Sequence, residues 1–305
     1  MTSRTFSRHP VLRAELLERY SNVRFNEDGL TLAGEAFTQF TSGRRKLITA
    51  LERVDERILD ALPDLDVISK FGVGLDMLDT RAMARHGVRL GWTGGVNKRS
   101  VAELAVAFML SLLHLIPLTN REMVEGTWKN RQGRELSGRV VGIIGCGNVG
   151  KDLTKLLRAF GCAVLANDIL DFPEFYAAHQ VEPVALEDLL RRSDVVTLHV
   201  PLDDSTRGML DATRLSLVKQ DAVLVNTARG GLVDEIALKQ MLMDGRLAGA
   251  AFDVFATEPP NDRELLRLPN FLATPHIGGS SDEAVLAMGR AAISGLDENR
   301  LPAFD

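Results

Sequence analysis

An apolar, strand-like run at residues 140–144 leads directly into Gly145-Cys-Gly-Asn-Val-Gly150, and a helical pattern covers residues 149–160. In a G-x-G-x-x-G segment between a strand and a helix, Gly145 would permit a tight turn and Gly147 would let the main chain approach a ligand closely. Gly150 would let the helix pack on the strand, and the helix amino terminus offers N–H groups to an anion. The segment therefore predicts a βα unit that binds the pyrophosphate of a dinucleotide.

Apolar segments alternate with helical stretches along most of the chain. After residue 139 they fall at 163–166, 195–200, 222–225, 248–254 and 271–274, and before it at 47–51, 67–71 and 88–92. Near-continuous apolar strands separated by helices are typical of parallel sheets that are covered on both faces. We therefore predict an α/β fold with two Rossmann-like or flavodoxin-like domains, each a doubly wound parallel sheet.

A long helix is expected between the two series of strands. Ser100 and Glu103 have the spacing of a capping box, which would start the helix at Ser100. Leu104, Phe108 and Leu112 follow at helical spacing. Because a helix that is apolar on several faces usually packs against another domain or subunit, this segment predicts such an interface.

The overall composition argues against several kinds of partner. The net charge is −5, so there is no excess of basic residues to attract nucleic acid. No apolar run reaches the length of a membrane span, and the first ten residues do not resemble a secretory signal. The two cysteines, Cys146 and Cys162, form neither a disulfide framework nor a metal-ligand pattern. We therefore expect a cytoplasmic protein without nucleic-acid, membrane or metal partners.

An acidic residue follows the strand predicted at 163–166. Asp168 stands 18 residues after Gly150. A carboxylate at this place accepts hydrogen bonds from the adenosine ribose hydroxyls and repels a 2′-phosphate. Ile169 and Leu170 follow, and neither could bind a phosphate group. The sequence therefore predicts NAD, and not NADP, as the cofactor.

Several further segments carry a more specific pattern. They are 72–76 (GVGLD), 100–103 (SVAE), 200–202 (VPL) with Thr206, 226–234 (NTARGGLVD), 251–255 (AFDVF) with 258–260 (EPP), and 274–279 (TPHIGG). Together with the glycine motif, and in this order, they resemble the D-isomer-specific 2-hydroxyacid dehydrogenase family, and within it the phosphoglycerate dehydrogenases. The resemblance runs from about residue 47 to the end of the chain.

The resemblance implies a nucleotide-binding domain at residues 96–281, inserted into a substrate domain formed by residues 1–95 and 282–305. It also implies a catalytic trio of Arg229, Glu258 and His276. The His276 imidazole could exchange the hydroxyl proton while hydride moves, and Glu258 would bind its other ring nitrogen. The planar guanidinium of Arg229 suits a substrate carboxylate. The implied reaction is hydride transfer between NAD and a small 2-hydroxy or 2-oxo acid.

The same resemblance implies further binding residues. Lys70 and the main chain of Gly72, Val73 and Gly74 would bind the substrate, and Asp253 would accept a hydrogen bond from the nicotinamide carboxamide. The other implied cofactor contacts are Asn148, Val149, Val200, Thr206, Thr227, Ala228, Gly278 and Gly279. The family likeness also implies a homodimer. His199 receives no role from the resemblance and is left as structural or unassigned.

Two questions stay open at this point. In phosphoglycerate enzymes an arginine after the strand at 47–51 helps to hold the substrate phosphate, whereas this chain has Thr49 or a neighbour there, with Arg53 a few residues on. Phosphoglycerate is therefore one candidate substrate among several, and Glu258 argues against formate, whose enzymes carry glutamine at that place. An alternative function is that of an NAD(H)-sensing transcriptional co-regulator similar to the C-terminal-binding proteins, which share this fold.

Overall fold

The computed structural model describes residues 1–303. Contacts between residues divide them into two compact units, one formed by Met1–Asn97 with residues 279 onward and the other by Lys98–Gly278. The sequence predicted that the second unit spans residues 96–281. Its predicted start is therefore two residues too early, and its predicted end is three residues too late.

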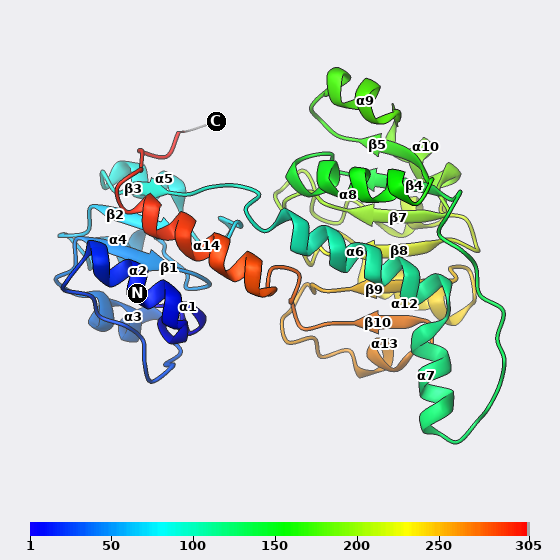
Figure 1. Cartoon of the computed structure of the whole chain (residues 1–305), viewed down its shortest axis with the longest axis horizontal. Helices are drawn as coiled ribbons and strands as arrows, with labels where there is room; N and C mark the ends of the chain where they lie inside the picture. Colours follow the sequence, from blue (N-terminus) through cyan, green and yellow to red (C-terminus); the bar gives the residue numbers. More distant parts are fainter. Residues whose placement is uncertain (304–305) are drawn as a thin grey trace. The chain divides into compact units, whose positions relative to one another are not determined.

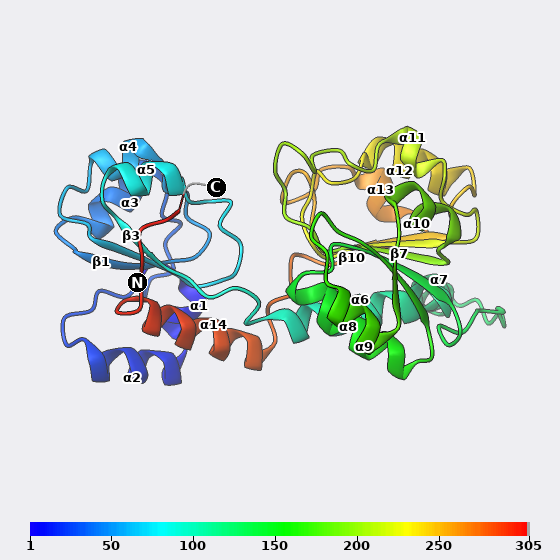
Figure 2. The ribbon, with the colours of Figure 1, turned by 90° about the horizontal axis from the view of Figure 1, so that it is seen from above.

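The first unit contains a three-stranded parallel sheet with the order β1-β2-β3 (Figure 1). Its strands are β1 (Lys46–Thr49), β2 (Val67–Lys70) and β3 (Arg89–Gly91). Because the order follows the sequence, right-handed crossovers place the two connecting helices on one face of the sheet, where a third helix joins them (Figure 2). These helices are α3 (Gly34–Thr41), α4 (Glu56–Asp60) and α5 (Thr80–Arg85).

The other face of this sheet is covered by helices from both ends of the chain (Figure 2). They are α1 (Arg4–Arg8), α2 (Pro10–Arg19) and α14 (Asp282–Gly295). Phe6, Leu12 and Ile293 share one buried cluster, so the last helix shares a hydrophobic core with the first two. A β-carbon on Gly91 of β3 would overlap the carbonyl group of Gly295, which shows how closely α14 approaches the sheet.

The second unit is built on a seven-stranded parallel sheet with the order β10-β9-β8-β7-β4-β5-β6. Its strands are β4 (Val140–Ile144), β5 (Ala163–Asn167), β6 (Val181–Pro183), β7 (Val195–Leu198), β8 (Val223–Asn226), β9 (Gly249–Phe252) and β10 (Phe271–Ala273). The strand order reverses between β4 and β7, and ligands of open α/β sheets bind at the carboxyl ends of the strands at such a reversal. This places the expected nucleotide site at the ends of β4 and β7.

Helices cover both faces of the seven-stranded sheet (Figures 1 and 2). One face carries α6 (Lys98–Leu113), α8 (Asn148–Ala159) and α9 (Pro173–His179). The other carries α10 (Leu186–Arg192), α11 (Ala212–Leu215), α12 (Glu235–Met243) and α13 (Arg263–Arg267). Each face has its own buried cluster, centred on side chains such as Phe108 and Leu153 on the first and Leu189 and Leu238 on the second.

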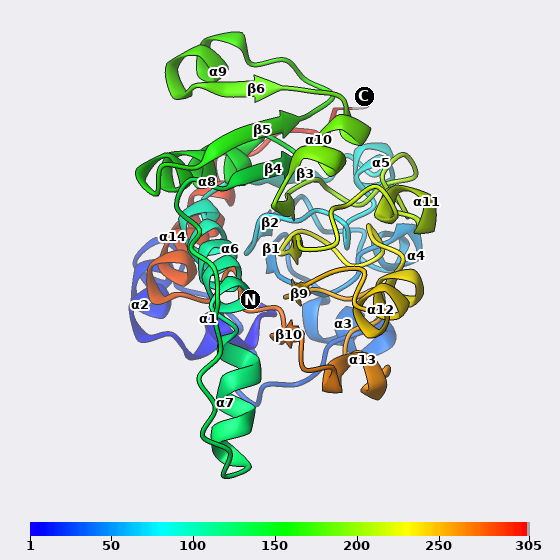
Figure 3. The same ribbon diagram turned by 90° about the vertical axis from the view of Figure 1, so that its right-hand side faces the viewer.

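A further helix, α7 (Ile116–Val124), continues from the end of α6 and extends away from the sheet of its unit (Figure 3). No single helix in residues 1–303 is long and apolar enough to cross a membrane. α6 and α7 together reach that length and apolarity, but the pair is bent by 63°. Seven side chains of α6 are buried, so most of its apolar surface packs within the second unit.

The predicted capping box at Ser100 is wrong. α6 begins two residues earlier, at Lys98, and the Ser100 hydroxyl donates a hydrogen bond to the carbonyl of Gly278 at 2.6 Å. The sequence did not predict α1 to α3 or the short edge strand β6. Pro183 of β6 cannot donate a hydrogen bond and is tolerated because β6 has one neighbouring strand.

Candidate dinucleotide and catalytic site

The glycine motif forms a tight turn between β4 and α8. Gly145 has φ +96°, and a β-carbon there would lie 2.7 Å from the main chain of His199. A β-carbon on Gly150 would overlap the carbonyl oxygen of Gly145, so the third glycine lets α8 pack against the turn. By contrast, a β-carbon on Gly147 would meet no atom within 4 Å. The second glycine therefore faces open space beside the amino terminus of α8, as a main-chain anion site requires.

Asp168 follows β5 and contacts this turn directly. Its Oδ2 accepts a hydrogen bond from the main-chain N–H of Cys146 at 2.6 Å, and its Oδ1 accepts one from Leu170 at 2.9 Å. Each carboxylate oxygen can accept a second bond, so two ribose hydroxyls could still bind. The neighbouring residue, Ile169, is uncharged and fully exposed. Position 169 therefore provides no cation that could bind a 2′-phosphate beside Asp168.

Two buried polar atoms without a partner belong to residues that directly follow the adjacent strands β7 and β8. Leu198 of β7 is in register with Asn226 of β8, so the next residues, His199 and Thr227, are neighbours. His199 Nε2 lies 2.9 Å from Thr197 Oγ1, while its Nδ1 and the Thr227 Oγ1 are both buried and unpartnered. Because an unpartnered buried polar atom is costly, a polar ligand at this edge fits the residues present.

His276 and Glu258 form a contact pair in the loops after β10 and β9. His276 Nδ1 lies 2.9 Å from Glu258 Oε2, and the main-chain N–H of Phe255 donates to Glu258 Oε1 at 3.1 Å. Glu258 is thus held at one oxygen by its own loop and orients the imidazole with the other. The Nε2 of His276 is then the ring nitrogen that can face a substrate.

The turn that carries His276 is tied to a buried carboxylate. Asp253, which is 1% exposed, accepts hydrogen bonds from Thr274 Oγ1 at 2.5 Å and from the main chain of Ile277 and Gly278, each at 2.7 Å. Two more main-chain bonds join His276 N–H to the carbonyls of Asp253 and Thr274. His276 itself has φ +55°, an uncommon conformation for a residue other than glycine, which these bonds maintain.

Arg229 lies in the loop after β8, the strand beside β9. The side chain of Asn226 accepts from the Ala228 N–H at 3.1 Å and donates to the Arg229 carbonyl at 2.9 Å. Arg229 Nη1 donates to the Ala228 carbonyl at 2.7 Å. The loop is therefore held by a buried amide, and the arginine extends from the same edge of the sheet as Glu258 and His276.

The other predicted cofactor residues follow the same edge. Val200 comes after β7, and Thr206 Oγ1 donates to the Pro201 carbonyl at 2.8 Å, which shapes the loop there. Gly278 ends the second unit, whereas Gly279 is counted with the first. Asn148 and Val149 are the first residues of α8, whose opening N–H groups have no partner within the helix.

The predicted substrate residues lie at the carboxyl end of β2 in the first unit. Gly72 has φ +129°, and the carbonyl of Val73 accepts a hydrogen bond from Trp92 Nε1 at 2.9 Å. Lys70 is 5% exposed, and its ammonium group donates to the carbonyl of Ala50. The turn at Gly72 to Gly74 thus has a defined conformation that glycine permits.

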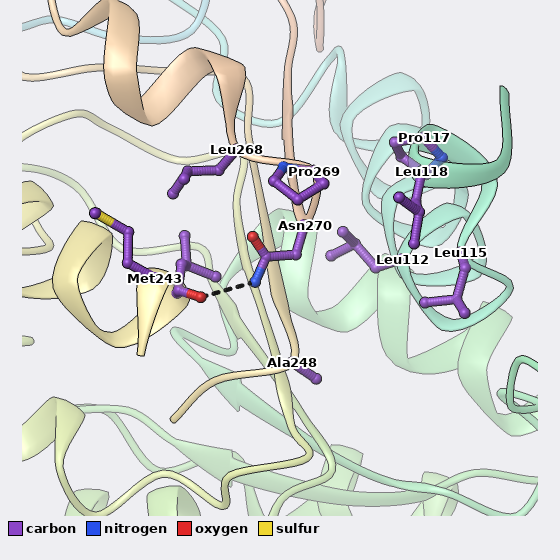
Figure 4. A pocket seen from close by; sticks show the side chains of 10 residues that line it. Leu112, Leu115, Pro117, Leu118, Met243, Ala248, Leu268, Pro269 and Asn270 are labelled. Carbon is purple, nitrogen blue, oxygen red and sulfur yellow. Dashed lines mark hydrogen bonds between the residues drawn. The ribbon is translucent and has the colours of Figure 1, made fainter. Parts of the chain in front are cut away.

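An apolar cavity of about 420 Å³ lies at the opposite edge of the second unit's sheet (Figure 4). It is lined by the ends of α6 and α12, the start of α7 and the segments before β9 and β10. Its polar lining residue is Asn270, whose side chain donates to the Leu242 carbonyl at 3.2 Å. The cavity contains no titratable group and is therefore not the catalytic site.

Comparisons with known proteins agree with this geometry. Residues 106–278 match the model of the D-isomer specific 2-hydroxyacid dehydrogenase, NAD binding domain. The chain is 37% identical over 252 residues to a hydroxypyruvate reductase of Thermotoga maritima, covering 80% of each chain. It is 38% identical over 240 residues to a D-3-phosphoglycerate dehydrogenase of Mycobacterium bovis, covering 78% of this chain and 46% of that protein.

The fold is also shared with solved structures. A glyoxylate reductase from Paecilomyes thermophila superimposes with a TM-score of 0.84 at 26% identity, covering 94% of this chain and 90% of the other. The chain spans less than half of the phosphoglycerate dehydrogenase and most of the two reductases. The resemblance seen in the sequence is confirmed: the chain belongs to the D-isomer-specific 2-hydroxyacid dehydrogenases, NAD-dependent oxidoreductases that act on CH–OH groups.

Proposed function

We propose that this chain reduces a small 2-oxo acid to the D-2-hydroxy acid with NADH, and catalyses the reverse oxidation, through Arg229, Glu258 and His276. The observation that carries the proposal is the 2.9 Å contact between Glu258 and His276 at the carboxyl edge of the nucleotide-binding sheet. Hydroxypyruvate, glyoxylate and phosphohydroxypyruvate are the candidate substrates, since relatives are named for reactions of these acids.

Bound NADH supplies the hydride for reduction. In that direction His276, protonated and held by the Glu258 carboxylate, donates its Nε2 proton to the carbonyl oxygen as this becomes a hydroxyl. In oxidation the neutral imidazole removes the same proton, and Glu258 stabilises the imidazolium that forms. Arg229 binds the substrate carboxylate and its positive charge draws electron density from the adjacent carbonyl.

The proposal is tested by NADH oxidation with a panel of 2-oxo acids. We expect turnover with at least one of them, and a fall of about 10²–10⁴-fold in kcat for His276→Ala with NADH binding retained. His114→Ala, at an exposed position just after α6, is the matched control and should keep its activity. Near-normal kcat in a folded His276→Ala variant would overturn the assignment.

We also propose that the protein is a homodimer in the cytoplasm. Met123, Val124 and Trp128, on and after α7, are 53%, 81% and 88% exposed, and the neighbouring cavity is apolar, so this surface suits a second copy. Both cysteines are unpaired and buried, which suits a reducing compartment. Analytical ultracentrifugation should give twice the monomer mass, and Trp128→Asp should shift the equilibrium toward monomer. A monomer at all concentrations would contradict the dimer.

A further inference from the structure

A glutamate and a lysine hold the same residue at the carboxyl edge of the first unit's sheet. Glu52 Oε2 accepts hydrogen bonds from the Ala50 N–H at 2.7 Å and from Thr49 Oγ1 at 2.8 Å. The Lys70 ammonium group donates to the carbonyl of the same Ala50. The loop after β1 and the end of β2 are thus joined through one residue, with a carboxylate and an ammonium group on its two sides.

The remaining side chains of this loop add no positive charge at that place. Thr49 is fully buried, and its hydroxyl is used by Glu52. The Arg53 side chain is 79% exposed, and its Nε lies 3.6 Å from an Asp55 oxygen. One carboxylate and one ammonium group thus bind Ala50, whereas phosphate groups are typically bound by cationic side chains such as arginine.

The loop that carries Glu52 follows β1 next to the turn that follows β2, because Thr49 and Lys70 are register partners at the ends of these strands. Neighbouring strands are about 4.8 Å apart, so the third carbon of an acid held at the Gly72 turn is within reach of the loop after β1. A phosphate on that carbon would bring a charge of about −1.5 to −2 toward the Glu52 carboxylate. A hydroxyl there could instead donate a hydrogen bond to it.

Resting on the proposed function, we infer that Glu52 is a specificity-determining residue. It selects 2-oxo acids with an uncharged, hydroxylated third carbon, such as hydroxypyruvate, and disfavours their phosphate esters. Lys70 neutralises Glu52 in part and keeps the loop in place, but it does not provide a phosphate site by itself.

The first test compares kcat/KM for hydroxypyruvate and 3-phosphohydroxypyruvate with NADH. The unmodified protein should prefer hydroxypyruvate by at least about tenfold, because like charges brought together are costly. Glu52→Gln keeps an oxygen that can accept from Ala50 and Thr49, and it should move the ratio about tenfold toward the phosphate ester, mainly through KM. Glu18→Gln on the exposed face of α2 makes the same change in net charge and should leave the ratio unaltered. A preference for the phosphate ester, or an unchanged ratio in Glu52→Gln, would overturn the inference.

The second test does not depend on turnover. Trp92 donates to Val73 in the substrate turn, so its fluorescence in a Trp128→Phe background should report binding there. Glycerate should bind more tightly than 3-phosphoglycerate, and Glu52→Gln should reverse or remove that order. Binding in this order without turnover of any 2-oxo acid would contradict the proposed reaction and leave the role of Glu52 supported. Tighter binding of 3-phosphoglycerate, or no binding of either acid, would refute the role of Glu52.

Discussion

Gly230 packs against Phe255 so closely that a β-carbon on residue 230 would overlap the Phe255 carbonyl group. Gly230 directly follows Arg229, and the N–H of Phe255 donates to Glu258 at 3.1 Å. One close main-chain contact thus sets the spacing of the loops that carry two of the three proposed catalytic residues. No side chain, however small, fits in that contact without moving one loop.

Gly230→Ala should therefore impair catalysis as well as stability. We expect kcat/KM to fall by at least about tenfold, since small misplacement of catalytic groups is costly, and the free energy of unfolding to fall by about 1–3 kcal/mol. Gly245→Ala, in an exposed turn with φ +66° and no atom within 4 Å, is a control for backbone effects. It should lose about 1 kcal/mol of stability with activity unchanged. Equal kcat/KM values for Gly230→Ala and Gly245→Ala would show that the spacing between the loops of Arg229 and Glu258 is not critical for catalysis.

Glu258→Gln should slow the reaction in both directions. Glu258 Oε2 lies 2.9 Å from His276 Nδ1, and its negative charge stabilises the imidazolium that exists whenever His276 holds the transferred proton. We expect kcat to fall by at least about tenfold while NADH binding is retained. Steady-state kinetics in both directions measure this, and a near-normal kcat would separate Glu258 from the proton transfer.

Asp168→Asn should weaken the preference for NAD over NADP. The amide oxygen can still accept from the Cys146 N–H, but the negative charge that repels a 2′-phosphate is gone. We expect the ratio of kcat/KM values for NADH and NADPH to fall by about tenfold, as the loss of a like-charge contact suggests. Asp171→Asn, an exposed neighbour, should leave the ratio unchanged. Equal use of both cofactors by the unmodified protein would refute the role of Asp168.

His199 should make the protein less stable in mild acid. Burial lowers the pKa of its imidazole to about 3, so the folded protein keeps it neutral while the unfolded chain takes up a proton below about pH 6.5. The unfolded state is then favoured as the pH falls, by about 2 kcal/mol between pH 7 and pH 5. In urea titrations between pH 7 and pH 5, the free energy of unfolding of His199→Gln should fall by about 2 kcal/mol less than that of the unmodified protein. An identical pH dependence in both proteins would show that His199 is protonated in the folded state.

Much of the fold could be predicted because its signals are local. Apart from β6, the strands of the second unit are short, largely apolar runs, and each is followed by a glycine or polar residue. The contact between Asp168 and the glycine turn could be expected from spacing alone, because a βα unit brings the two together whatever the rest of the chain does. α1 to α3 were not predicted because they precede β1, so no strand comes before them to indicate an alternation of strands and helices.

The features that local sequence patterns do not reveal depend on partners far apart in the sequence. Ser100 has the pattern of a helix cap, but its hydroxyl donates to Gly278, and no pattern near residue 100 reveals that partner. The unpartnered Nδ1 of His199 could not be foreseen, because its surroundings form only when β7 lies beside β8. Glu258 and His276 are 18 residues apart, and their pairing came from the family resemblance. Glu52 carried no signal, since its role follows from the place where Lys70 and Ala50 meet.

The place of α14 has a consequence for the order in which the protein can form during synthesis. The nucleotide-binding unit is one continuous stretch that leaves the ribosome before α14 does. Phe6 and Leu12 of the first unit, by contrast, share their core with Ile293, near the end of the chain. Because domains generally fold as units during translation, we expect the second unit to fold while the amino-terminal segment still exposes apolar surface. The nascent chain would thus expose this apolar surface until α14 emerges.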